Sequence, residues 1–87
     1  MVRFTEKVNV SGGLHARPAS VLVHKINQYR STVTIRCGNR QTNGKSILGV
    51  MALGAKPGDE VDFEIEGADE REAAEDIRQL FLRDFAM

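Results

Sequence analysis

The residues of this chain best suited to chemistry lie in one short segment, residues 12–20, which reads Gly-Gly-Leu-His-Ala-Arg-Pro-Ala-Ser. His15 stands just before a predicted helix, with Arg17 two residues further on and Pro18 in the first helical turn. Proline is tolerated there because the first N–H groups of a helix have no intrahelical partner. Those N–H groups, the positive end of the helix and Arg17 together favour a phosphate or carboxylate. The segment therefore predicts an anion site at which a histidine ring carries a phosphoryl group.

An imidazole ring is well suited to carry a phosphoryl group, which must be accepted and later released. Its neutral ring nitrogen is nucleophilic near neutral pH, since its unperturbed pKa is about 6.5. Phosphoryl transfer depends largely on positioning and on stabilising the charge spread over the equatorial oxygens. We expect the Arg17 guanidinium and the backbone N–H groups of Ala16 and Arg17 to supply that stabilisation. The residues alone do not identify which nitrogen of His15 reacts.

Charge is distributed unevenly along a chain whose net charge is zero. Residues 1–58 contain nine Lys and Arg against one Glu, a balance of +8, whereas residues 59–87 contain three Arg against eleven Asp and Glu, a balance of −8. If the acidic segments pack away from His15, the histidine lies in a positive field that attracts acidic partners. A nucleic-acid partner is not expected, because Lys and Arg form no run and the few aromatic residues mostly fall at core positions.

The remaining composition restricts the class of protein. A chain of 87 residues predicts one small domain, residues 1–87. No apolar stretch approaches a membrane span and no basic-then-apolar leader opens the chain, so we expect a cytoplasmic protein without membrane contact. The single cysteine, Cys37, fits a reducing compartment and shares the alternation of the preceding strand, which predicts a buried position. We expect no cofactor. We also expect no metal, because no cysteine or carboxylate cluster joins His15 and His24. His24 itself is expected on a helix surface.

The hydrophobic pattern predicts the element order βαββαβα. Alternating apolar residues predict strands at residues 2–10, 32–37 and 61–66, with Glu6 breaking the alternation of the first. The Gly38-Asn39 turn predicts a further short, polar strand around residues 40–43. Helical spacing predicts helices at residues 16–29, directly after Ser46 as N-cap, and after Asp69, which we expect to form a capping box with Glu72. Because each strand has one apolar face, the chain is predicted to be an α+β open-faced sandwich: a four-stranded, mostly antiparallel sheet covered on one side by three helices.

Two segments of the chain resemble the signature segments of HPr, the histidine-containing phosphocarrier family of the bacterial phosphoenolpyruvate-dependent sugar phosphotransferase system. They are residues 13–19, Gly-Leu-His-Ala-Arg-Pro-Ala, and residues 45–51, Lys-Ser-Ile-Leu-Gly-Val-Met. Length, element order and both motif positions agree over essentially the whole chain. The second segment is closer to the Gram-positive type. Leu48 stands where a methionine is common, and Ser11-Gly12 precedes the first motif less typically.

The resemblance implies that His15 accepts a phosphoryl group, at Nδ1, from phosphorylated enzyme I and passes it to a sugar-specific enzyme IIA, with Arg17 on the phosphoryl oxygens. It implies a monomeric carrier with a covalent phosphohistidine, rather than a free-standing enzyme. Ser46 is implied to be the target of HPr kinase/phosphorylase, which slows His15 phosphorylation. In relatives, the serine-phosphorylated form binds a catabolite-control repressor in carbon catabolite repression. The expected apolar docking contacts beside His15 are Leu14, Ile47, Leu48 and Met51.

Three alternatives remain open at the level of sequence. The chain could be mainly a serine-phosphorylated corepressor, although such a protein would not need His15. It could be a small α+β interaction module without chemistry. It could also be a nitrogen-branch paralogue of the carrier, against which the Lys45–Met51 segment favours the sugar branch. The transported sugars are not encoded here, since their specificity lies in the enzyme II partners.

Overall fold

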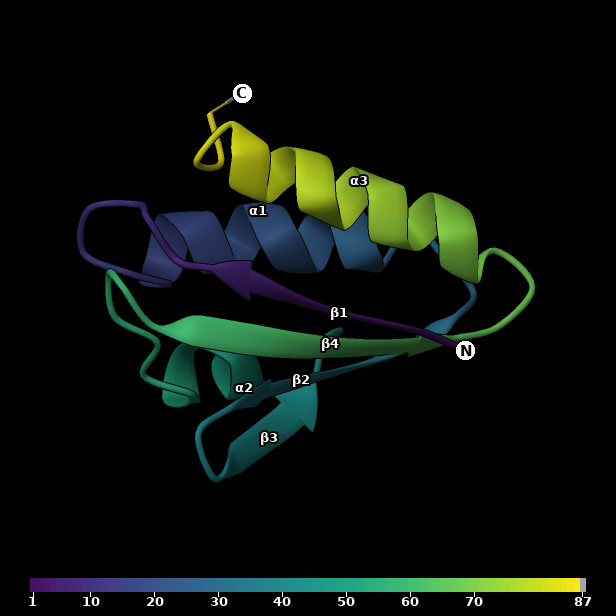
Figure 1. Cartoon of the computed structure of the whole chain (residues 1–87), viewed down its shortest axis with the longest axis horizontal. Coiled ribbons are helices and arrows are strands. Elements are labelled where there is room, and N and C mark those ends of the chain that lie inside the picture. Colours follow the sequence, from purple (N-terminus) through teal and green to yellow (C-terminus); the bar gives the residue numbers. More distant parts are fainter. Residues whose placement is uncertain (87) are drawn as a thin grey trace.

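The seven elements occur in the predicted order in a computed structural model, which describes residues 1–86 (Figure 1). The strands and helices alternate irregularly along the chain, and the last helix is the longest. The strands are β1 (Val2–Lys7), β2 (Thr32–Cys37), β3 (Arg40–Asn43) and β4 (Glu60–Glu66), and the helices are α1 (Ala16–Ile26), α2 (Ile47–Ala52) and α3 (Glu70–Leu82).

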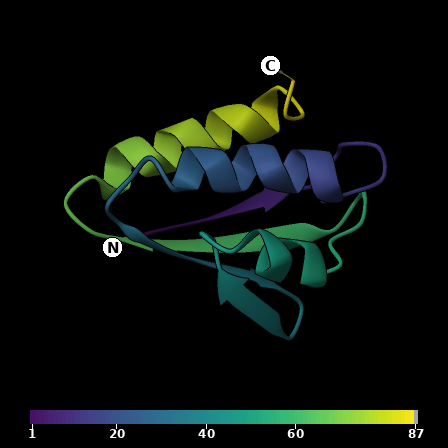
Figure 2. The ribbon, with the colours of Figure 1, turned by 180° about the vertical axis from the view of Figure 1, so that it is seen from behind.

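The four strands form one antiparallel sheet in the order β1-β4-β2-β3, so the last strand of the chain lies between the first two. Alternate residues of β4, namely Val61, Phe63 and Ile65, are buried, as the period of two requires. Helices α1 and α3 lie side by side over this apolar face (Figures 1 and 2), and the short α2 packs against α1 and β3. The predicted α+β open-faced sandwich is confirmed.

The acidic residue that breaks the apolar alternation of β1 is paired with a residue of α3. Glu6 lies on the inner face of the strand, half-buried, and its carboxylate is 3.5 Å from Nε of Arg78. The same guanidinium lies over the ring of Phe4, 5.4 Å from its centroid. The strand ends at Lys7, three residues before the predicted end. Beyond Lys7, only Val8 continues the backbone hydrogen bonding of the strand, and its N–H donates to Asp59 O at 2.8 Å.

Helix α1 ends at Ile26, so the predicted end at residue 29 is wrong. Asn27 closes the helix: its side-chain amide donates to Val23 O at 2.9 Å and to Lys45 O at 3.2 Å. The second bond ties the end of α1 to the loop before α2, and tight turns of the backbone follow. Apolar spacing continues to Tyr29 because that residue still packs against the core, although it is no longer helical.

The predicted capping box of Asp69 and Glu72 is also wrong. Asp69 does precede α3, but its side chain makes no capping hydrogen bond. Its carboxylate instead accepts from the backbone N–H groups of Arg30 and Ser31, at 2.9 and 3.0 Å, and from the Ser31 hydroxyl. The Ser31 hydroxyl is the main cause that holds the pKa of Asp69 below its ordinary value. Asp69 therefore closes the loop between α1 and β2, because that loop offers three donors.

Candidate functional site

The loop before α1 is held against the loop that follows α2. Gly13 N–H donates to Val10 O at 3.0 Å, and Leu14 N–H donates to Ala55 O, also at 3.0 Å. Gly13 has a φ of +72°, and a Cβ at this position would lie 2.2 Å from Ala55 O. Only glycine fits such a close approach at a left-handed φ. The position of His15, two residues after Gly13, is therefore fixed by contact with the loop after α2.

His15 is the N-cap of α1, as the sequence predicts. Its backbone is extended, with a φ of −79° and a ψ of −168°, and its carbonyl accepts from Ala19 N–H at 2.9 Å. The exposed imidazole makes no capping hydrogen bond. Its Cδ2–Nε2 edge faces Gly12, where an added Cβ would lie 2.9 Å from Cδ2 and 3.3 Å from Nε2. Nδ1 belongs to the opposite edge of the ring, which Gly12 does not cover.

The first turn of α1 provides anion-binding groups next to this ring. Ala16 and Arg17 occupy the first two helical positions, where backbone N–H groups have no intrahelical acceptor. Pro18, which has no N–H, and Ala19 are buried and anchor the turn. Arg17 is exposed, and within residues 1–86 no carboxylate forms a salt bridge with it. The structure thus brings His15, Ala16 and Arg17 together at one helix end.

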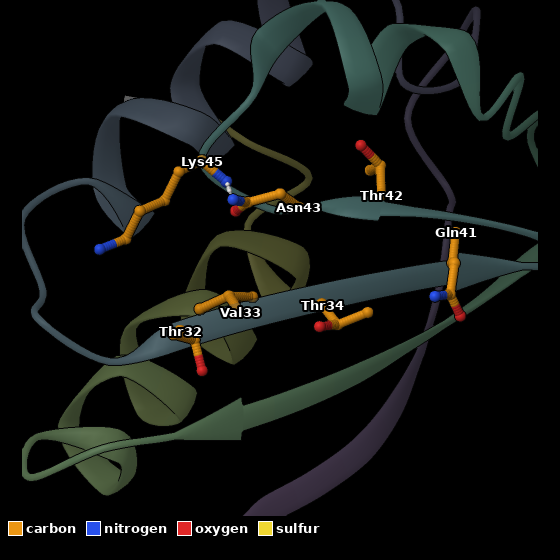
Figure 3. A pocket seen from close by; sticks show the side chains of 7 residues that line it. All are labelled: Thr32, Val33, Thr34, Gln41, Thr42, Asn43 and Lys45. Atoms are coloured by element: carbon orange, nitrogen blue, oxygen red, sulfur yellow. Dashed lines mark hydrogen bonds between the residues drawn. The ribbon is translucent and has the colours of Figure 1, made fainter.

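Ser46 caps α2, which confirms the prediction from its position in the sequence. Its hydroxyl oxygen accepts from Gly49 N–H at 3.0 Å. The approach to Ser46 is fixed by Asn43, whose side-chain oxygen accepts from Lys45 N–H at 2.9 Å (Figure 3). Because Asn27 at the C-terminal end of α1 binds Lys45 O, Ser46 lies near the end of α1 opposite to His15. The 11 residues of α1 span about 16 Å, so the two residues are well separated.

Three of the four expected docking residues share an exposed apolar surface on α2. Leu48 is 77% exposed, and Ile47 and Met51 are each 40% exposed. We refer to these three residues as the α2 patch. Leu14 does not join it: only 4% of the residue is exposed, because its side chain belongs to the hydrophobic core. The expectation for Leu14 is corrected accordingly, and its role beside His15 is to anchor the loop.

Sequence reasoning missed the part that Ala55 and Gly12 play in holding His15. Ala55 carries no functional group, and its carbonyl acts only because the chain returns to residue 13 in space. A polar hollow of about 280 Å³ between β2 and β3 is lined by none of the site residues (Figure 3).

Two further expectations concern isolated residues. His24 is exposed on α1, as predicted. Cys37 is half-buried at the end of β2, less enclosed than predicted, and burial raises the pKa of its thiol. In the part of the chain that the structure describes, no three His, Cys, Asp or Glu side chains gather to hold a metal ion. No helix among those residues has the length and apolar character needed to cross a bilayer.

Comparison with known proteins agrees with this geometry. A family model described as "PTS HPr component phosphorylation site" matches residues 2–82. The chain belongs to the HPr family. The phosphocarrier protein HPr of Mycoplasma capricolum subsp. capricolum (strain California kid) is 38% identical over 82 residues, which cover 94% of this chain and 92% of the relative.

Further HPr relatives extend the comparison. The crystal structure of HPr-C-His from Thermoanaerobacter tengcongensis superimposes with a TM-score of 0.94 at 35% identity, covering 98% of this chain and 96% of that one. The HPr-like protein Crh of Bacillus subtilis (strain 168) is 38% identical over 77 residues, covering 88% of this chain and 91% of the relative. As an HPr-family member, the chain is a phosphocarrier of the phosphotransferase system, and other proteins of that system are its partners.

Proposed function

We propose that the chain acts in the cytoplasm as a single phosphocarrier domain that accepts a phosphoryl group on His15 from phosphorylated enzyme I and passes it to sugar-specific enzyme IIA. The observation that carries the proposal is the free, exposed imidazole at the start of α1, whose Nε2 edge packs on Gly12. That packing leaves the Nδ1 edge as the side from which a phosphoryl group approaches.

The chemistry follows from the groups around Nδ1. With the ring proton on Nε2, the Nδ1 lone pair attacks phosphorus, a nitrogen–phosphorus bond forms, and the bond to the donor's histidine breaks. The N–H groups of Ala16 and Arg17 and the guanidinium of Arg17 stabilise the negative charge on the equatorial oxygens. Transfer onward reverses these events with an enzyme IIA histidine as the nucleophile. The carrier supplies positioning and charge stabilisation in both directions.

Incubation with phosphoenolpyruvate and catalytic enzyme I tests the acceptor. We expect the intact mass to rise by one acid-labile phosphoryl group in the wild type and in His24→Ala, and to remain unchanged in His15→Ala. His24 is the matched control, because it is the only other histidine and is also exposed on α1. Phosphorylation of the His15→Ala protein, or its loss in His24→Ala, contradicts the assignment.

We further propose that Ser46 is a regulatory phosphorylation site acting through the α2 patch. A phosphate adds about −1.5 to −2 charges, which the start of a helix tolerates, so the fold is retained. Ile47 and Leu48 follow Ser46 directly, and both are exposed. The added charge therefore lies at the edge of the α2 patch and repels acidic partners that dock there. This inhibition does not require direct contact between the phosphate and the distant His15.

Substitutions that separate charge from capping test this regulation. Ser46→Asp should slow phosphorylation by enzyme I, and the slowing should weaken at higher ionic strength because salt screens exposed charges. Ser46→Asn is the matched control, since asparagine caps helices about as well as aspartate but is neutral. Equal slowing in both variants, or none in Ser46→Asp, contradicts an electrostatic mechanism.

A mainly regulatory function is the second candidate, because the chain is 38% identical to Crh, an HPr-like protein. In that case a serine-phosphorylated form would bind a catabolite-control repressor while enzyme I left His15 unmodified. The same mass measurement therefore decides between the two functions. A nitrogen-branch carrier is distinguished by its preference for a different enzyme I.

A further inference from the structure

A second concave surface lies between α1 and α3, away from the α2 patch. Figures 1 and 2 show α1 running between α3 on one side and α2 on the other. The groove has a volume of about 470 Å³. Its lining comes from one face of α1, the turn that follows α1, and the C-terminal end of α3 with the residue after it: Ser20, Val21, His24, Lys25, Gln28, Leu80 and Arg83. None of these residues takes part in the proposed phosphoryl transfer.

The charge of this groove is one-sided. Lys25, which is half-buried, and Arg83 line it, and no carboxylate does. Within residues 1–86 neither cation forms a salt bridge. Asp76, one helical turn before Leu80, is already engaged by the Tyr29 hydroxyl. Two cations thus face a shared hollow without an anion of the described chain to balance them.

The floor of the groove is apolar. Leu80 is 1% exposed, and Val21 is half-buried against the core. Ser20 on α1 and Gln28 in the turn after α1 add a hydroxyl and an amide group. An apolar floor with a few polar groups and a volume of several hundred Å³ is typical of a small-molecule site.

We propose that the α1–α3 groove binds a small organic anion, a phosphate or carboxylate carried on a short apolar body. The anionic group pairs with Arg83 and Lys25 through charge-assisted hydrogen bonds, and the apolar body covers Val21 and Leu80. A docked acidic helix fits less well, since a helix in a groove uses anchors at three or four positions and only two apolar side chains line this one.

A nuclear magnetic resonance titration of the full chain with phenyl phosphate tests the proposal. We expect saturable shifts at Val21, Lys25 and Leu80. Lys25→Gln and Arg83→Gln should each weaken binding about tenfold, because each removes one charge-assisted hydrogen bond to the anion. Arg71→Gln is the matched control: Arg71 is exposed on α3 but does not line the groove, so binding should not change.

Four outcomes overturn the proposal. These are the absence of saturable shifts, shifts confined to residues 15–17, equal affinity for inorganic phosphate, and equal affinity for neutral benzyl alcohol. The second outcome assigns the anion to the start of α1. The last two show that the apolar floor or the cations contribute nothing. Phosphorylation by enzyme I, measured on the same variants, reports on His15 separately, so failure here leaves the proposed phosphocarrier function standing.

Discussion

Replacing Gly13 by alanine should break the contact that holds the His15 loop against the loop after α2. Gly13 has a φ of +72°, and the added Cβ would lie 2.2 Å from Ala55 O and 3.0 Å from Cα of Lys56. Both obstacles are backbone atoms, so no side-chain rotation relieves the overlap. The two loops must separate, and the hydrogen bond from Leu14 N–H to Ala55 O is lost.

The magnitude has two parts. A left-handed φ costs a non-glycine residue about 1–2 kcal/mol. The lost hydrogen bond contributes roughly another 1 kcal/mol, and the displaced packing adds to it. Gly54→Ala is the matched control, because Gly54 has a φ of +67° and an added Cβ there meets nothing within 4 Å. We therefore expect a destabilisation of about 3 kcal/mol for Gly13→Ala and about 1 kcal/mol for Gly54→Ala.

Urea unfolding monitored by circular dichroism measures both variants, and phosphorylation by enzyme I is followed on the same samples. The Gly13→Ala protein should also accept the phosphoryl group more slowly under conditions where it remains folded, because His15 is displaced from the start of α1. If Gly13→Ala destabilises the protein no more than Gly54→Ala does, the contact with Ala55 does not hold this loop, and the reasoning fails.

Three further predictions follow from single contacts. Ser46→Ala should lower the free energy of unfolding by about 1 kcal/mol in urea melts, since it removes the α2 cap, and Ser46→Asn should restore it. The Ser31 hydrogen bond lowers the pKa of Asp69. The stabilisation of the fold by this hydrogen bond is therefore present above pH about 4 and is lost as the pH falls through the pKa that Asp69 has in the folded protein. Asp69→Asn should therefore lower the urea midpoint at pH 7, by an amount that shrinks on acidification; a constant difference contradicts this. The Asp76 carboxylate, by accepting the phenol's hydrogen bond, raises the pKa of Tyr29 to about 12. The stabilisation from this hydrogen bond should therefore be fully present below pH about 10 and be lost as the pH rises from there through about 12. Tyr29 is the only tyrosine, so ultraviolet absorbance reports its ionisation directly, and Asp76→Asn should lower the midpoint.

The sheet and the Ser46 cap were predictable because their signals are local. The strand at residues 32–37 has the predicted bounds, since alternation fixes which face of a strand is buried. The strand at residues 40–43 also has the predicted bounds, since the Gly38-Asn39 turn fixes where it begins. The cap at Ser46 depends on a backbone N–H only three residues away. The place of the Ala16 and Arg17 backbone N–H groups in the first turn of a helix was predictable for the same reason.

The errors at Asp69, Glu6 and Leu14 share one cause, which is a partner remote in the sequence. Asp69 was expected to cap its own helix, but its donors lie 38 and 39 residues earlier. Glu6 breaks the apolar alternation of the first strand because its partner, Arg78, lies on α3. Leu14 was expected at the surface because it neighbours His15, yet the fold brings Ala55 against its backbone and the core around its side chain. Such contacts exist only after the chain has folded, so spacing alone does not reveal them.

The position of β4 between β1 and β2 has a consequence for biosynthesis. Val2 pairs with Ile65, so the first strand has no neighbouring strand until residues 60–66 have left the ribosome. The backbone bonds from Val8 to Asp59 and from Leu14 to Ala55 have the same requirement. Contacts so distant in sequence form late, since long loops must close first. We therefore expect nascent chains that lack β4 to be poor phosphoryl acceptors, because the contacts that hold the loop before His15 are not yet made.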